Sequence, residues 1–175
     1  LWAVNTGRSL EHALEGVVDG SFPFMPDFFI TREQDIFEVD ELGRCVAFGQ
    51  WNELGRQVHD RLFMRSSSLL DRVRQFVENE TRAQFISEEG DPAGLIASSV
   101  DEMDLICQQI DPWLREEPEL AYERNTIYLR FAHRDYNKGT TLLEVAQTFG
   151  MEAAHCFAIG DGPNDLGMLN PAVAA

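Results

Sequence analysis

The hydrophobic and polar positions near the N-terminal end alternate between strand-like runs and helical spacing. The apolar run 1–5 predicts a short buried strand, and Ser9 then precedes apolar residues at helical spacing (10, 13, 14, 17 and 18). A second strand is predicted over 28–31, after two prolines. The order strand, helix, strand predicts a right-handed parallel α/β unit.

The pattern changes after a predicted hairpin over 35–39 and 45–48. One helix is predicted around Leu69–Val77 and another after Ser99, which has a capping-box spacing to Glu102. Short strands are predicted over 83–86 and 95–97, on either side of a turn at 90–92, and over 126–131. We interpret 51–130 as a compact α+β insertion.

The α/β pattern returns in the last part of the chain. Lys138 begins a predicted helix that Gly150 ends, and 156–159 predicts a short strand leading into an acidic loop. The predicted fold class is therefore α/β, with a parallel-sheet core over 1–50 and 131–175 and the insertion between them. Because the chain opens inside an apolar run without an initiator Met, we expect a longer protein truncated at both ends.

Charge and composition exclude several classes of partner. Thirty acidic and fourteen basic residues give a net charge of −16, which leaves no broad cationic face for nucleic acid. Any phosphate site in this chain therefore needs local positive charge. The three cysteines have no zinc-site spacing, and no apolar run has the length of a membrane span. We expect a cytoplasmic protein that contacts neither nucleic acid nor membrane.

The acidic loop carries the strongest chemical signal. Asp161 and Asp165 stand four residues apart directly after the predicted strand, and Asn164 lies beside the second aspartate. Mg²⁺ prefers hard oxygen ligands, and open α/β sheets place ligands at the carboxyl ends of strands. The loop therefore predicts a magnesium site, against the alternative of an acidic turn in which an Asp caps the next helix.

Two further segments predict a phosphate site. An ammonium group at a helix start, as at Lys138, is able to reach a phosphoryl oxygen, although most lysines are solvated surface residues. At Thr6-Gly7-Arg8, a hydroxyl follows a predicted strand and the glycine permits close backbone approach. The alternative for this segment is an ordinary strand-to-helix turn.

Taken in order, the three segments resemble the motifs of the haloacid dehalogenase superfamily of phosphohydrolases. The resemblance is to the group with a large α+β cap (C2-type), which includes Cof-type sugar phosphatases, sucrose-phosphate phosphatase and phosphomannomutase. It implies a Rossmann-like core with an inserted cap. It also implies that Thr6 and Lys138 bind the transferring phosphoryl group, with Gly7 and Arg8 beside it. Mg²⁺ would be held by the two aspartates of the acidic loop, which Asn164 supports.

The sequence also departs from that family. The family's first motif, Asp-x-Asp-Gly-Thr, supplies the attacking aspartate and the general acid/base, and it belongs upstream of Thr6, where this sequence has no counterpart. The segment Val17–Ser21 imitates that motif but has Val17 at the attacking position. Thr31–Gln34 also departs from the Thr-Ser-Asn-Gly of many relatives. We therefore expect the 175 residues alone to be inactive.

The function implied for the intact protein is Mg²⁺-dependent hydrolysis of a small phosphorylated metabolite, such as a sugar phosphate, through an aspartyl-phosphate. Two alternatives remain open. One is a sugar phosphomutase, which would use the same phosphate- and metal-binding residues. The other is a non-catalytic phosphate- or metal-binding module without the attacking residue.

Overall fold

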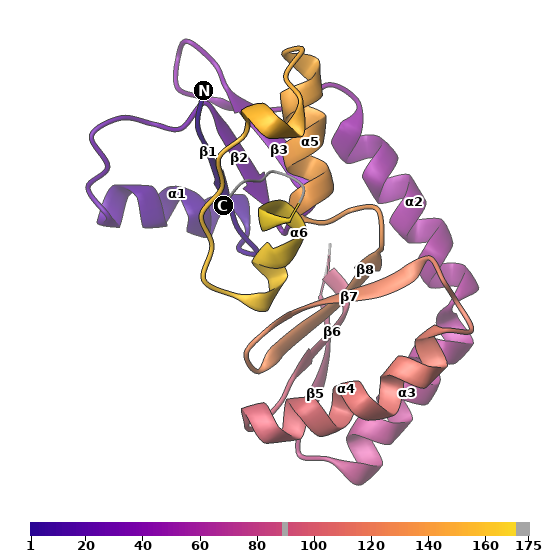
Figure 1. Cartoon of the computed structure of the whole chain (residues 1–175). Helices are drawn as coiled ribbons and strands as arrows, with labels where there is room; N and C mark the ends of the chain where they lie inside the picture. Colours follow the sequence, from indigo (N-terminus) through magenta and orange to yellow (C-terminus); the bar gives the residue numbers. More distant parts are fainter. Residues whose placement is uncertain (89–90, 171–175) are drawn as a thin grey trace. The chain divides into compact units, whose positions relative to one another are not determined.

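The computed structural model describes residues 1–88 and 91–170, which form two compact units (Figure 1). The first unit comprises Leu1–Gln57, Tyr136–Gly160 and the residues from Asp165 onward. The second comprises Val58–Asp135 together with the four residues Asp161–Asn164. The chain therefore enters the second unit between residues 57 and 58 and leaves it between residues 135 and 136, and it returns to that unit briefly over 161–164.

The first unit contains a four-stranded sheet. Its strands are β1 (Ala3–Asn5), β2 (Phe28–Thr31), β3 (Asp35–Val39) and β4 (Cys45–Ala47), in that order across the sheet. β1 and β2 are parallel, whereas β2–β3 and β3–β4 are antiparallel. The helices are α1 (Leu10–Asp19), α5 (Lys138–Thr148) and the short α6 (Leu166–Leu169). The predicted strands over 28–31 and 35–39 are confirmed with the same bounds.

Helices cover both faces of this sheet because the side chains of β2 alternate between them. Phe28 and Ile30 pack in one cluster with Val145 of α5. Phe29 packs in another cluster with Ala13 and Val17 of α1. Successive side chains of a strand point to opposite faces, so α1 and α5 lie on opposite sides of the sheet. This arrangement confirms the predicted α/β class.

Local capping signals begin and end these helices as predicted. The hydroxyl of Ser9 accepts a hydrogen bond from the backbone N–H of His12, which caps α1. Gly150 follows α5 with a φ of +67°, a left-handed conformation that glycine adopts at little cost.

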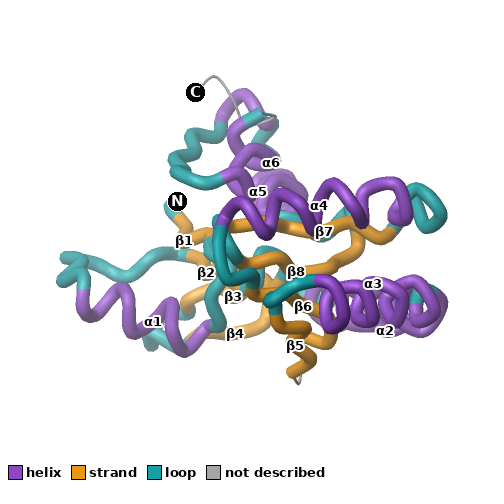
Figure 2. Tube along the Cα trace, turned by 90° about the horizontal axis from the view of Figure 1, so that it is seen from below, coloured by secondary structure: helices purple, strands orange, loops and turns teal. Residues whose placement is uncertain are grey.

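The second unit consists of an antiparallel sheet packed against helices (Figure 2). Its strands lie in the order β5 (Gln84–Glu88), β6 (Asp91–Ile96), β8 (Tyr128–His133) and β7 (Leu120–Asn125). Its helices are α3 (Ser67–Glu80), α4 (Val100–Leu114) and the last part of α2 (Trp51–Arg65). One hydrophobic core joins them, and its fully buried members include Val73, Ile106 and Leu95.

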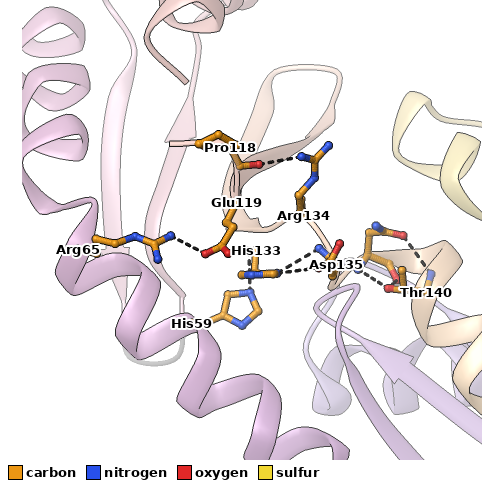
Figure 3. Close-up of polar contacts among 9 residues, drawn as sticks. His59, Arg65, Pro118, Glu119, His133, Arg134, Asp135 and Thr140 are labelled. Carbon is orange, nitrogen blue, oxygen red and sulfur yellow. Dashed lines mark hydrogen bonds and ion pairs between the residues drawn. The ribbon is translucent and has the colours of Figure 1, made fainter. Parts of the chain in front are cut away.

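Several polar contacts tie the helices of this unit to its strands. The backbone N–H of His133, at the end of β8, donates to Nε2 of His59 in α2 at 3.0 Å (Figure 3). Arg65, also in α2, makes ion pairs with Glu119 at 2.6 Å and Glu117 at 3.1 Å. These contacts anchor α2 to the end of β8 and to the residues just before β7.

Some predicted elements of the insertion differ from the structure. α2 was not predicted, because its sequence is mostly polar and Leu62 is its only buried hydrophobic residue. The strand predicted over 126–131 begins at Tyr128, since Thr126 has a φ of +55° and lies in the hairpin turn. The predicted turn at 90–92 includes residue 90, which lies outside the described residues.

The capping box predicted for α4 is formed only in part. Ser99 accepts from the N–H of Glu102 as expected. The carboxylate of Glu102 does not bind Ser99; it accepts from the backbone N–H groups of Ser98 and Arg82, both at 2.7 Å. Glu102 therefore joins the start of α4 to the segment before β5.

The prediction of a strand over 156–159 is wrong. The structure describes these four residues, and they form no regular secondary structure. An apolar run becomes a strand only when it has a neighbour with which to form a hydrogen-bonded ladder. No described strand pairs with this segment, and its Phe157 and Ile159 are each 77 % exposed.

All three cysteines are free thiols. None of the described helices combines the length and the apolar character that a membrane span requires.

Candidate active site

Lys138 is held at the first turn of α5 by a capping box. The Oδ1 atom of Asn137 accepts from the N–H groups of Gly139 and Thr140, at 2.9 and 3.1 Å. The hydroxyl of Thr140 in turn accepts from the N–H of Asn137 at 3.0 Å. This reciprocal arrangement satisfies backbone donors that a helix start leaves unpaired.

Lys138 is also the single lysine among the 175 residues, and it is only 6 % exposed. The alternative of a solvated surface lysine is therefore wrong. Its ammonium group donates to Oδ1 of Asp165 at 2.6 Å, and the two side chains are 7 % and 6 % exposed. Removing charges from water is costly, so a pair this deeply buried is weak evidence that the two charges serve stability.

The alternative for the acidic loop, an Asp that caps the next helix, is not supported at Asp165. This residue occupies the N-cap position of α6, but its side chain makes no capping hydrogen bond there. The carboxylate is directed instead to Lys138.

Glycines permit the close approach of the segments that meet here. A Cβ atom on Gly160 would lie 2.6 Å from Oδ2 of Asp165. A Cβ atom on Gly139 would overlap the backbone carbonyl of Gly167. Any larger residue at position 160 or 139 would therefore push the acidic loop or α6 away from the start of α5.

Thr6 lies directly after β1 and is fixed by its backbone. Its N–H donates to the carbonyl of Ile30 at 2.9 Å, and its carbonyl accepts from Glu33 at 3.1 Å. Its hydroxyl accepts from the N–H of Arg8 at 3.2 Å, and an oxygen that accepts in this way keeps its own proton to donate. Gly7 and Arg8 are exposed, and a Cβ atom on Gly16 of α1 would lie 3.5 Å from Nη1 of Arg8.

The segment Thr31–Gln34, which departs from the pattern of many relatives, packs against the loop that contains Thr6. Arg32 and Glu33 have φ values of +49° and +64°, an uncommon conformation for residues other than glycine. Their N–H groups donate to the carbonyls of Arg8 and Thr6. The turn therefore holds the Thr6 loop by its backbone.

Sequence reasoning missed Asn5. The side-chain amide of this residue, at the end of β1, donates to the carbonyl of Lys138 at 3.0 Å across 133 residues of sequence. No local pattern marks such a contact in advance. It links the strand that carries Thr6 to the helix that begins with Lys138.

The other residues of the acidic loop belong to the second unit. Asp161 is exposed, whereas Asn164 is 7 % exposed. In the described part of the chain, no three His, Cys, Asp or Glu side chains are grouped to hold a metal ion. Aspartate oxygens nevertheless suit Mg²⁺, which usually takes one or two carboxylates, and Gly160 leaves room for the Asp165 carboxylate.

A cavity of about 610 Å³ lies beside β1 within the first unit. Its walls are mainly apolar and come from β1, β2, α5 and the segment 151–159, with Val145, Phe157 and Ile159 among the lining residues. β1 is the edge strand of the described sheet, and its one described partner is β2. An unpaired strand edge and an apolar cavity therefore lie side by side.

Solved structures with a similar fold include two phosphatases and a related hydrolase. The chain resembles sucrose-phosphatase from Synechocystis sp. PCC6803 with a TM-score of 0.70 at 16 % identity, covering 98 % of this chain and 66 % of that one. It resembles the haloacid dehalogenase-like hydrolase yhjK from Bacillus subtilis with a TM-score of 0.60 at 15 % identity, covering 98 % and 64 %. For the C-terminal domain of trehalose-6-phosphate phosphatase from C. albicans the TM-score is 0.61 at 9 % identity, covering 97 % and 58 %.

The chain thus spans 66 % or less of the length of these three proteins, and identities this low establish the fold alone. No curated protein matches the sequence. The family model described as haloacid dehalogenase-like hydrolase matches residues 62–174, which is more than half of the chain. The chain therefore belongs to the haloacid dehalogenase-like hydrolase family.

Proposed function

We propose that the intact protein is a Mg²⁺-dependent phosphatase that hydrolyses a small phosphorylated metabolite, most specifically a sugar phosphate. The observation that carries this proposal is the buried pair of Lys138 and Asp165, linked through Asn5 to the strand end that bears Thr6. The family supports hydrolysis. The similar structures include a sucrose-phosphatase with sucrose and phosphate and a trehalose-6-phosphate phosphatase, which supports a phosphorylated sugar as substrate.

The residues of the first unit would hold the phosphoryl group. The hydroxyl proton of Thr6 would be donated to a phosphoryl oxygen, because the hydroxyl oxygen already accepts from Arg8. The ammonium group of Lys138 would offset the negative charge of that group in a chain of net charge −16. Gly7 and the exposed Arg8 would lie beside this group, and Arg8 would add positive charge there.

Mg²⁺ would be held by Asp161 and Asp165, with Asn164 supporting the loop. When bound, the ion would neutralise phosphoryl charge and orient the group for in-line attack. The chain itself orients the Asp165 carboxylate. The ammonium group of Lys138 binds it, and the absence of a side chain at Gly160 leaves room for it.

The attacking carboxylate would come from a strand paired to the free edge of β1, seated in the cavity beside it. The apolar walls of the cavity and the exposed Phe157 and Ile159 suit such a strand. Attack by this carboxylate on phosphorus would form an aspartyl-phosphate and release the alcohol, which takes a proton from a second acid. Water would then cleave the acyl phosphate, which frees inorganic phosphate and restores the carboxylate. Without that strand, the 175 residues should not hydrolyse phosphate esters.

The second unit would act as the cap that selects the leaving group and excludes bulk water. The assignment of 51–130 to this role, and the cytoplasmic location, stay predictions. Substrate choice would then depend on residues of that unit.

Phosphate release from a panel of sugar phosphates, with Mg²⁺ and with EDTA, tests the proposal in the intact protein. We expect Mg²⁺-dependent release, and a loss of roughly 10²–10³ in kcat for Lys138→Met. Arg115→Met is the charge-matched control, because Arg115 is exposed at the end of α4. Full activity in EDTA, or wild-type kcat in Lys138→Met, would refute the proposal. Activity that requires a sugar bisphosphate would instead indicate the mutase, and phosphate binding without turnover a binding module.

A further inference from the structure

We infer that Asn5 is a positioning residue, which sets the place of Lys138 relative to the phosphoryl-binding loop at Thr6. The inference rests on the proposed function of that site. Asn5 ends β1 and directly precedes Thr6, and its Nδ2 donates to the carbonyl of Lys138 at 3.0 Å. A single side chain therefore ties the strand end that carries the hydroxyl to the helix residue that carries the ammonium group.

The hydrogen bond acts on the backbone of Lys138, and the side chain of Lys138 extends from there to Asp165. The carbonyl of Lys138 also accepts from the hydroxyl of Thr141 at 3.1 Å, and Asn137 caps the same turn. These other contacts come from within α5 and its cap. The contact from Asn5 comes from β1, so it determines where the turn lies relative to Thr6.

The Asn5 side chain reaches α5 through its donor group and not through its acceptor. Its Oδ1 atom is buried and has no hydrogen-bond partner among the described residues. A buried acceptor without a donor is unfavourable, and such groups in native proteins are few and call for an explanation. Here the amide is needed for its donor side, because a carbonyl at Lys138 cannot be bonded by an apolar residue or by a carboxylate.

Two substitutions separate the effect of the Asn5 hydrogen-bond donor from the effect of its side-chain shape. Asn5→Leu removes the amide at similar size, and Asn5→Asp keeps the shape but presents an oxygen to the carbonyl of Lys138. Asn52→Leu is the matched control. Asn52 also ties a helix to a strand in the same unit, through two hydrogen bonds to the backbone of Ile36, at 2.8 and 2.9 Å.

The test has one readout that does not depend on turnover. Lys138 is the single lysine among the 175 residues, so in the intact protein the NMR signal of lysine labelled with ¹³C at Cε that disappears in Lys138→Met reports on this site. We expect that signal to move in both Asn5 variants and to stay in place in Asn52→Leu. In the intact protein, kcat should fall roughly 10- to 10²-fold in the Asn5 variants, as for other small misplacements of reacting groups. Asn52→Leu should lower the thermal midpoint with kcat unchanged.

The outcomes distinguish this inference from the proposed function. An unmoved lysine signal in Asn5→Leu and Asn5→Asp would overturn the positioning role, whether or not the protein hydrolyses phosphate esters. A wild-type protein without phosphatase activity would overturn the proposed function, while a moved signal would still establish that Asn5 places Lys138. Equal losses of kcat in the Asn5 variants and in Asn52→Leu, at equal thermal midpoints, would also overturn the role.

Discussion

The ammonium group of Lys138 and the carboxylate of Asp165 form a 2.6 Å ion pair in which both side chains are more than nine-tenths buried. The two residues are 27 positions apart in the sequence. Removing one partner leaves the other charge buried without its counter-charge, which is typically far more costly than removing both.

The first prediction concerns the stability of this pair. Lys138→Met or Asp165→Leu alone should lower the free energy of unfolding by about 3–5 kcal/mol, whereas the double variant should lose much less. Urea unfolding of the wild type and the three variants forms a double-mutant cycle. Additive losses across that cycle would show that the two charges are not coupled.

The second prediction compares two helix caps. Asn137 caps α5 through its side chain, so Asn137→Ala should cost about 0.5–2 kcal/mol. Ser66 occupies the N-cap of α3 but makes no capping bond, and its buried hydroxyl has no partner among the described residues. Ser66→Ala should therefore be neutral or stabilising in the same denaturation assay. A larger loss for Ser66→Ala than for Asn137→Ala would contradict these cap assignments.

The third prediction uses the same substitution at two glycines. In Gly139→Ala the new Cβ atom would meet the backbone of Gly167, at 2.6 Å from its carbonyl carbon, so we expect a loss of about 1–3 kcal/mol. Gly16 lies inside α1, where a Cβ atom finds only Nη1 of Arg8 at 3.5 Å. Gly16→Ala should stabilise the protein by about 0.5–1 kcal/mol through helix propensity. Thermal midpoints that move in the same direction for both variants would refute the packing argument.

The fourth prediction concerns pH. Hydrogen bonds from the hydroxyl and the N–H of Ser98, then from the N–H of Arg82, hold the pKa of Glu102 below its ordinary value of 4.5. A carboxyl whose pKa is lowered by folding adds stability above its unfolded pKa and loses it as the pH falls through the folded value. The wild type should therefore be more stable than Glu102→Gln at pH 7, and the difference should shrink below about pH 4.5.

Thermal unfolding between pH 7 and pH 3 measures that difference. Asp101→Asn is the control, because Asp101 lies in the same first turn of α4 and removes the same charge from the helix start. If the difference for Glu102→Gln stayed constant down to pH 3, the carboxylate would not be the group that titrates.

The sequence by itself determined the features that depend on neighbours a few positions away. The cap at Ser9, the stop at Gly150 and the strand Phe28–Thr31 follow from local spacing and backbone preferences, and all three are present. The acidic loop and Lys138 were also recognised locally, because each carries its chemistry in one short segment. Hydrogen bonds within a turn and alternation along a strand need no knowledge of the rest of the chain.

Only the tertiary structure decided which of these segments meet. The pairing of Lys138 with Asp165 and the hydrogen bond from Asn5 join residues 27 and 133 positions apart, and no periodicity encodes such distances. The same reason explains the error at 156–159. Its apolar residues favour a strand, but a strand forms only beside another strand with which it can share hydrogen bonds. Whether such a strand lies next to this segment depends on the fold of the rest of the chain.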